Sequence, residues 1–195
     1  MMEIEPVTLT GRSVRLEPLS QAHLPGLPRH GLDPDLWTWM PVRIRDAAGL
    51  ARYIDDALDE QQRGVSLPFA TVDALTGEVA GSTRYLNIER KQRRVEIGST
   101  WVMRPWQRSA VNTEAKYLML RHAFEQWCCL RVELKTDVNN VRSRTAIQRI
   151  GAREEGIFRG HMLMQGGRVR DTAYYSITYK EWPEVKRRLL ERMAA

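Results

Sequence analysis

The residues best suited to chemistry lie in one stretch of the 195-residue chain, from Glu96 to Ala115. Its first part alternates as a strand does, with successive side chains on opposite faces. We expect one face to carry Val95, Ile97 and Trp101, and the other to carry Glu96, Gly98 and Thr100. Glu96 would then lie beside the space left by the glycine, where it could act as a general base. The competing interpretation is a cross-strand salt bridge between Glu96 and an arginine.

The second part of this stretch predicts a short loop that opens a long helix, Thr113 to Trp127. The first backbone N–H groups of a helix have no partner within the helix, and the helix dipole is positive at that end. Such a helix start is a good seat for a diphosphate. Because many nucleotide-binding proteins share this arrangement, the topology alone indicates an anion site without identifying the ligand.

An alternating series of strands and helices must position these residues. Strand signals cover Val7 to Leu16 (a bent strand or hairpin around Gly11), Pro68 to Val72, Glu78 to Ile88, Arg94 to Met103, Arg131 to Asp137, Ala152 to Met164 and Arg168 to Tyr179. Helical spacing covers Ala22 to His30, Ala47 to Gln62, Thr113 to Trp127, Asn140 to Ile150 and Trp182 to Met193. This alternation predicts an α/β protein whose mixed sheet has helices on both faces. No linker rich in proline, glycine or serine divides the chain, so we expect a single domain over residues 1–195.

Two motifs resemble those of the GNAT superfamily of N-acetyltransferases, in the branch of the ribosomal-protein alanine N-acetyltransferases. The acetyl-CoA motif of that branch is matched by Glu96-Ile97-Gly98, Gln107 and Thr113-Glu114-Ala115. An Asn-x-x-Ser signature ahead of a helix is matched by Asn140-Val141-Arg142-Ser143, with Ile150-Gly151 at the helix end. The resemblance implies the GNAT fold, an α/β (α+β) domain with a mixed, mostly antiparallel sheet of six to seven strands. The chain departs from the pattern where Arg108, Ala110 and Asn112 replace glycines.

The resemblance also implies a reaction, in which a primary amine attacks the thioester of acetyl-CoA directly in a ternary complex. Glu96 would be the base, directly or through a water, and Ser143 the acid that protonates the departing thiolate. Asn140 would bind the pantetheine arm, unless it simply caps its helix. The diphosphate would be bound by Gln107 and by the backbone of Arg108, Ser109, Ala110, Val111 and Asn112. Further cofactor contacts are expected from Trp101, Val102 and Met103, where a backbone N–H would meet the oxyanion.

The acceptor side is less defined by sequence. In this fold the acceptor enters near the aromatic loop that holds Trp37, Trp39 and Met40, and near the hairpin from Met162 to Arg168. The two tryptophans either fill a core edge or wall this pocket. The resemblance tilts the choice of acceptor towards a protein N-terminus, with small-molecule amines as the alternative. Succinyl-CoA or another acyl donor remains open, with Arg84 as a partner for the extra carboxylate, and so does a CoA-binding or ribosome-associated module without catalysis.

The composition of the chain indicates which classes of partner it binds and in which cellular compartment it works. The net charge is +6, with 25 arginines and 5 lysines, but basic and acidic residues are interspersed, so nucleic-acid binding is not indicated. The adjacent Cys128 and Cys129 and the four histidines lack zinc-site spacing, so we expect no metal. The chain shows neither a signal-peptide pattern nor an apolar stretch of roughly 20 residues. We therefore expect a cytoplasmic enzyme without membrane contact, and the resemblance favours a homodimer.

Overall fold

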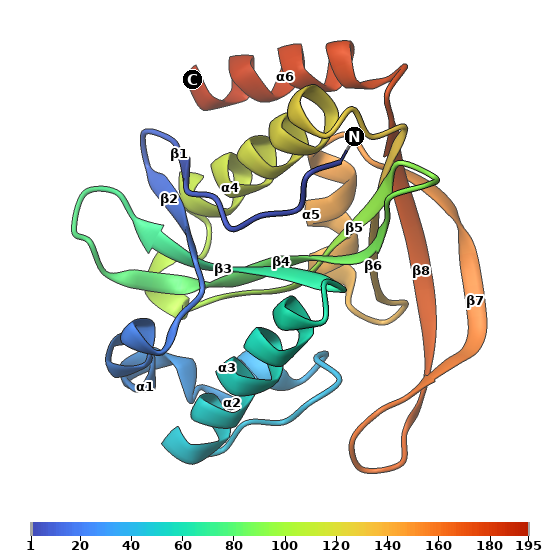
Figure 1. Ribbon diagram of the computed structural model, residues 1–195. Coiled ribbons are helices and arrows are strands. Elements are labelled where there is room, and N and C mark those ends of the chain that lie inside the picture. The colour runs from blue at the N-terminus through green and yellow to red at the C-terminus, as the bar shows by residue number, and fades with distance from the viewer. Residues whose placement is uncertain (1, 195) are drawn as a thin grey trace.

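The computed structural model describes residues 2–194 and joins all its strands in one eight-stranded sheet (Figure 1). The spatial order is β1-β2-β3-β4-β5-β6-β8-β7. The strands are β1 (Leu9–Thr10), β2 (Val14–Pro18), β3 (Ser66–Asp73), β4 (Val79–Glu89), β5 (Arg94–Val102), β6 (Arg131–Asp137), β7 (Arg153–Leu163) and β8 (Val169–Thr178). Every pair of neighbours is antiparallel except β5 and β6, which run parallel.

The prediction of a mixed, mostly antiparallel sheet is confirmed, but the sheet has eight strands where six to seven were expected. The expected strand Val7 to Leu16 divides into β1 and β2, whose turn is closed by a hydrogen bond from Gly11 N to Val14 O (2.9 Å). The Glu114 carboxylate anchors this turn by accepting hydrogen bonds from Arg12 N (2.8 Å) and Ser13 N (2.6 Å). A Cβ at position 11 would lie 2.5 Å from Cδ of Glu114, so a larger residue there would displace the carboxylate that anchors the turn.

Helices cover both faces of the sheet, as predicted (Figure 1). They are α1 (Pro28–Gly31), α2 (Pro34–Trp37), α3 (Ala47–Gln62), α4 (Ala110–Arg121), α5 (Val141–Arg149) and α6 (Trp182–Ala194), with 3-10 turns η1 (Gln21–Gly26) and η2 (Arg104–Trp106) and a π-helical turn η3 (His122–Gln126). One apolar core includes residues of α4, α5 and α6, and a second includes residues of α2 and α3. The sheet therefore separates two cores, and each has its own group of helices.

Three helical predictions needed adjustment. The segment Ala22 to His30 is a 3-10 turn and a short helix, because Pro25 and Pro28 interrupt the backbone hydrogen bonds of a continuous one. The expected aromatic loop contains the short helix α2, which Asp33 caps by accepting from Asp35 N. Helix α4 begins three residues before Thr113, since Ser109 caps it, and it continues into the π-helical turn.

Candidate active site

The sheet opens into a fork between β5 and β6. The two strands pair only at their first residues, through Arg94 with Arg131, Val95 with Val132 and Glu96 with Glu133. Beyond Glu96 the strands separate, although β5 continues to Val102 and β6 to Asp137. Helix α4 follows β5 and helix α5 follows β6, so both helices begin near the open end of the fork (Figure 1). An elongated ligand can enter such an opening without breaking strand pairing.

A β-bulge in β5 changes the side-chain faces predicted from strict alternation. Ser99 has a φ of 47°, and the pairing with β4 shifts from Arg84 opposite Gly98 to Ser82 opposite Trp101. The extra residue reverses the faces after Gly98. Trp101 therefore packs in the core under α3 rather than beside Val95 and Ile97, and Thr100 faces α4. The predicted grouping of Glu96 with Gly98 is unaffected.

Glu96 is buried, with 2% of its surface exposed, and its charge is paired. Its carboxylate lies 2.9 Å from Nζ of Lys135 on β6 and accepts a 2.7 Å hydrogen bond from Asn87 Nδ2. A cross-strand ion pair is therefore present, with a lysine instead of an arginine. Gly98 supplies the expected space, because a Cβ there would lie 2.8 Å from Oε1 of Glu96. Glu96 is thus fixed beside a gap at the point where the fork opens.

The loop from β5 to α4 has the features of an anion site. Ser109 caps α4 by accepting from Val111 N, and the φ of 62° at Arg108 is in the left-handed region that favours glycine. Ala110 and Asn112 belong to the first turn of α4, where no positive φ is needed. Of the three positions where the family pattern has glycine, only position 108 has a backbone conformation that favours glycine. The guanidinium of Arg108 is exposed.

The two motifs of the sequence meet in space. Gln107 donates from Nε2 to Val102 O (2.8 Å) and accepts at Oε1 from Arg142 of α5 (3.2 Å). Asn140 caps α5, since its Oδ1 accepts from Ser143 N (3.1 Å). The starts of α4 and α5 therefore lie side by side on one side of the sheet. Several N–H groups of these helix starts are already used, because Val111 N donates to Ser109 and Ser143 N and Arg144 N donate to Asn140. The positive dipole ends, the remaining N–H groups and the half-buried Ser143 suit the diphosphate and pantetheine of CoA.

The residues expected on the acceptor side separate into two groups. Trp37 is 1% exposed and donates from Nε1 to Gly31 O, so its indole fills the core instead of walling a pocket. Arg84 is also buried, pairs with Glu60 of α3 at 3.0 Å and lies over the ring of Tyr53, so this guanidinium is already engaged. Trp39 and Met40 are half-buried and remain accessible. The guanidinium of Arg168 lies 5.7 Å from the ring centre of Trp39.

Sequence reasoning missed a polar cluster on the same sheet face as Glu96. Tyr174 of β8 is paired with Lys135, and its hydroxyl lies 3.4 Å from Nε2 of His161 on β7. The pKa of His161 is lowered in total, because burial and the positive charges of Lys135 and Arg170 outweigh the opposing effect of the Glu96 carboxylate. Alternation of polar residues at positions 170, 172 and 174 of β8 was the available signal. This alternation shows that the three side chains share one face of the sheet, but it does not show that the face lies close to Glu96.

Among residues 2–194, no group of three or more His, Cys, Asp or Glu side chains is arranged to hold a metal ion. Within the same residues, no helix combines the length and apolar character needed to cross a membrane.

Comparison with known proteins is consistent with this geometry. Residues 13–153 match the family model described as the acetyltransferase (GNAT) domain. A Bacillus subtilis (strain 168) relative named as a candidate ribosomal N-acetyltransferase, YdaF, is 31% identical over 106 residues. That match covers 54% of this chain and only 57% of the length of the relative.

Solved structures of other acetyltransferases share this fold. A crystal structure described as a GCN5-related N-acetyltransferase from Brucella melitensis has a TM-score of 0.89 and 33% identity, covering 96% of this chain and 86% of that one. RimJ from Mycobacterium smegmatis, solved in complex with CoA-disulfide, has a TM-score of 0.79 and 25% identity over 96% of this chain and 95% of its own. The family match covers more than half of the sequence, and this chain belongs to the GNAT family of acetyltransferases.

Proposed function

We propose that this protein transfers the acetyl group of acetyl-CoA to a primary amine, most directly the N-terminal amine of a polypeptide, in a ternary complex. The observation that carries the proposal is the fork. Two adjacent helix starts lie on one side of it, and the carboxylate of Glu96 lies on the face with α3. The names of YdaF and RimJ support a protein acceptor, and in that case the enzyme would work in the cytoplasm.

Acetyl-CoA supplies the thioester, and residues at both helix starts would hold it. Gln107 and the backbone from residue 108 to 112 would bind the diphosphate, and the α5 start with Asn140 would bind the pantetheine. Among the described residues, β5 beyond Glu96 has no partner strand on the side of β6, and a backbone N–H on that edge, at Trp101 or Val102, is the source proposed for an oxyanion donor. Met103 N is already used, because it donates to Ala80 O (2.8 Å).

Two side chains would move the protons. An α-amine with a pKa of about 7.7 is mostly protonated at neutral pH and must lose a proton before it attacks. Glu96 would accept that proton through a water molecule, because its carboxylate is buried and already bound to Lys135 and Asn87. The amine nitrogen then bonds to the carbonyl carbon as the C–S bond breaks. Ser143 would donate its proton to the departing thiolate and take up the second proton of the attacking nitrogen, so that the products are the amide, the thiol and the proton held at Glu96.

Substitution of Glu96 by Gln tests this assignment. The variant keeps the shape of the side chain, so we expect kcat to fall by about 10² to 10⁴ while the Kd for acetyl-CoA stays nearly constant. Thiol release with peptides, amino acids, polyamines and aminoglycosides measures kcat, and calorimetry measures Kd. Glu89→Gln, at the exposed end of β4, is the matched control.

Two results would count against the proposal. Undiminished turnover by Glu96→Gln would remove Glu96 from the mechanism. Absence of acetyl-CoA binding at millimolar concentration would reject the helix starts as the CoA site. The homodimer remains a prediction, which the molar mass in solution would test.

A further inference from the structure

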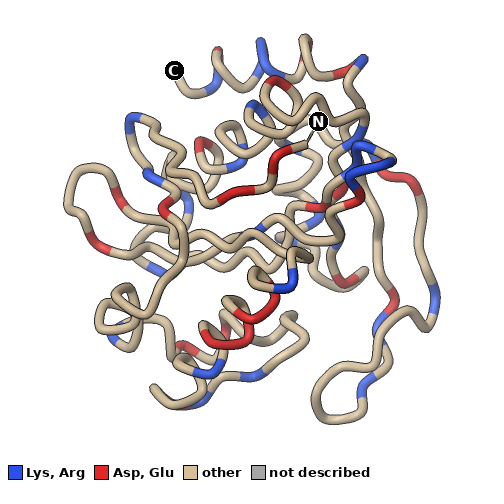
Figure 2. Tube along the Cα trace, in the orientation of Figure 1, with Lys and Arg blue, Asp and Glu red and all other residues tan. Residues whose placement is uncertain are grey.

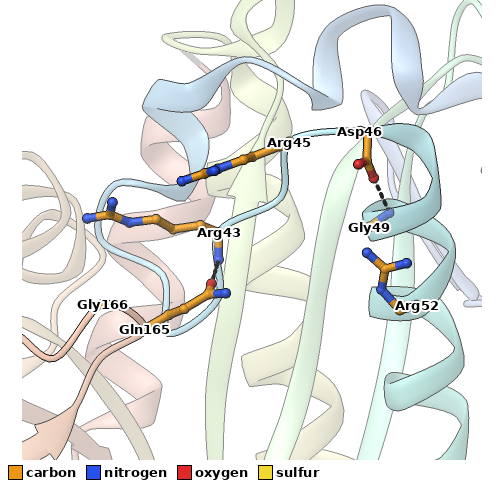
Figure 3. Close-up of a pocket in the computed structure, with 7 residues that line it drawn as sticks. All are labelled: Arg43, Arg45, Asp46, Gly49, Arg52, Gln165 and Gly166. Carbon is orange, nitrogen blue, oxygen red and sulfur yellow. Dashed lines mark hydrogen bonds between the residues drawn. The ribbon is translucent and has the colours of Figure 1, made fainter.

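Three arginines gather around a cavity of about 300 Å³ between the loop ahead of α3 and the tip of the β7–β8 hairpin (Figure 3). Arg43 and Arg45 come from the loop, and Arg52 comes from α3. Figure 3 shows the side chains of Arg43 and Arg45 extending in the same direction. None of the three forms an ion pair with any residue between 2 and 194.

The only acidic residue lining this cavity, Asp46, is already used. Its Oδ1 accepts a 2.7 Å hydrogen bond from Gly49 N and caps α3, the longest helix among the described residues. The positive end of the α3 dipole adds to the charge of the arginines. The cavity is therefore cationic, with two guanidinium groups from the loop and one from α3, each of the kind that binds carboxylates in bidentate fashion.

Both walls of the cavity are fixed to each other. The side chain of Gln165 accepts a hydrogen bond from Arg43 N, and Gln165 N donates to Pro41 O (3.3 Å). Ile44, between the two loop arginines, is 5% exposed and packs in the core under α3. The loop is thus held by its backbone and by a buried anchor, which leaves the guanidinium groups free for a ligand.

The positive charge continues from this cavity towards Glu96. Arg168, three residues after Gln165, lies over Trp39 and pairs with Asp137 at 2.7 Å. Arg170 is 5% exposed and forms no ion pair with any described residue, and its buried Nε has no hydrogen-bond partner. The charges of Asp137 and Glu96 act to raise the pKa of Arg170, whereas burial, the largest effect, lowers it, so this guanidinium is compensated in part from inside the protein.

We propose that the arginine cavity binds acidic side chains of the acceptor polypeptide, downstream of the amine that is acetylated. This inference rests on the proposed function and specifies its acceptor. Carboxylates of the acceptor would pair with Arg43, Arg45 and Arg52. These contacts would strengthen binding of the peptide and fix its position along the surface, while the acetyl transfer itself takes place beside Glu96.

A short acidic peptide fits this surface better than a nucleic acid. Beyond Arg52, α3 carries Asp55, Asp56, Asp59 and Glu60, and the Cα trace in Figure 2 shows acidic positions gathered on this helix. A nucleic acid carries charge along its whole backbone and would be repelled there. A peptide can place two or three carboxylates in the cavity and continue with neutral residues.

Binding of two peptides tests the proposal without requiring turnover. Both carry the same N-terminal residues and a fluorophore at the C-terminus, and they differ in three consecutive residues, Glu in one and Gln in the other. The three Glu or Gln residues are placed at successive positions in a series of peptides, because the number of residues needed to reach from the N-terminal amine to the cavity depends on the path of the peptide. Fluorescence anisotropy with CoA present gives Kd. We expect tighter binding of the Glu peptide, weakening as salt rises from about 0.05 M to about 0.5 M.

The double variant R43Q/R45Q should raise the Kd of the Glu peptide roughly three- to tenfold and leave that of the Gln peptide unchanged. The exposed Arg192→Gln on α6 is the control and should change neither. Equal binding of both peptides to the wild type at every position would overturn the inference. So would stronger, Arg43- and Arg45-dependent binding of an RNA oligonucleotide. If the Glu peptide binds as expected but is never acetylated, the site stands and the proposed function fails.

Discussion

At the residue scale, Lys116 carries the least expected charge in the molecule. It lies on α4 with 6% of its surface exposed, and its Nζ donates to Thr83 Oγ1 (3.0 Å) and Thr100 Oγ1 (2.6 Å). Within residues 2–194 it forms no ion pair with an acidic side chain. Burial lowers the pKa of Lys116 from 10.5 to about 7. The unfolded chain therefore binds this proton more tightly than the folded one. The resulting loss of folding stability has its full value below pH 7 and disappears as the pH rises towards 10.5.

Lys116→Met should therefore stabilise the protein at low pH. The two threonine hydroxyls remain hydrogen-bonded to each other at 2.8 Å, so the substitution leaves no buried orphan. We expect the free energy of unfolding to rise by a few kcal/mol at pH 6, and the gain to shrink steadily between pH 7 and pH 9. Urea unfolding across this range measures the difference from wild type. Lys180→Met, at an exposed lysine, is the control, and a gain independent of pH would contradict the assignment.

At the scale of elements, the periodic segments were predicted well and the irregular ones were not. Ala47–Gln62 and Arg131–Asp137 form α3 and β6 with the predicted bounds, because spacing alone defines a regular helix or strand. The predicted side-chain directions in β5 after Gly98 were wrong, because a bulge adds one residue and the alternation of polar and apolar residues does not predict a bulge at Ser99. The left-handed φ of Arg108 was indicated only by the glycine that the family pattern has at this position, because an arginine by itself does not predict that conformation.

The loop between β5 and α4 gives a prediction at this scale. A side chain in the left-handed region costs about 1–2 kcal/mol, part of which is offset because glycine has more freedom in the unfolded chain. Arg108→Gly should stabilise the protein by about 0.5–1 kcal/mol, while Arg108→Ala should not, because it removes the charge and keeps the strain. Thermal unfolding of both variants separates strain from charge. Equal melting temperatures for the two would show that φ at this position is unimportant.

At the scale of the molecule, the fork joins sites that are distant in sequence. Glu96 and the two helix motifs could be predicted because each has a local pattern. Lys135, His161 and Arg170 could not, because their relation to Glu96 depends on the parallel pairing of β5 with β6 and on the order β6-β8-β7. Such long-range pairing leaves no signature in the spacing of residues. The acceptor face therefore emerges only when the sheet is assembled.

The same geometry predicts how the cofactor affects overall stability. The starts of α4 and α5 belong to the two arms of the fork and are linked by the hydrogen bond between Gln107 and Arg142. CoA held by both would bind only the folded chain. At about 100 times its Kd it should add about 2.7 kcal/mol and raise the melting temperature by several degrees. Pantetheine, which lacks the diphosphate, should stabilise far less at equal concentration. An unchanged melting temperature with saturating CoA would mean that these two helix starts do not bind one ligand together.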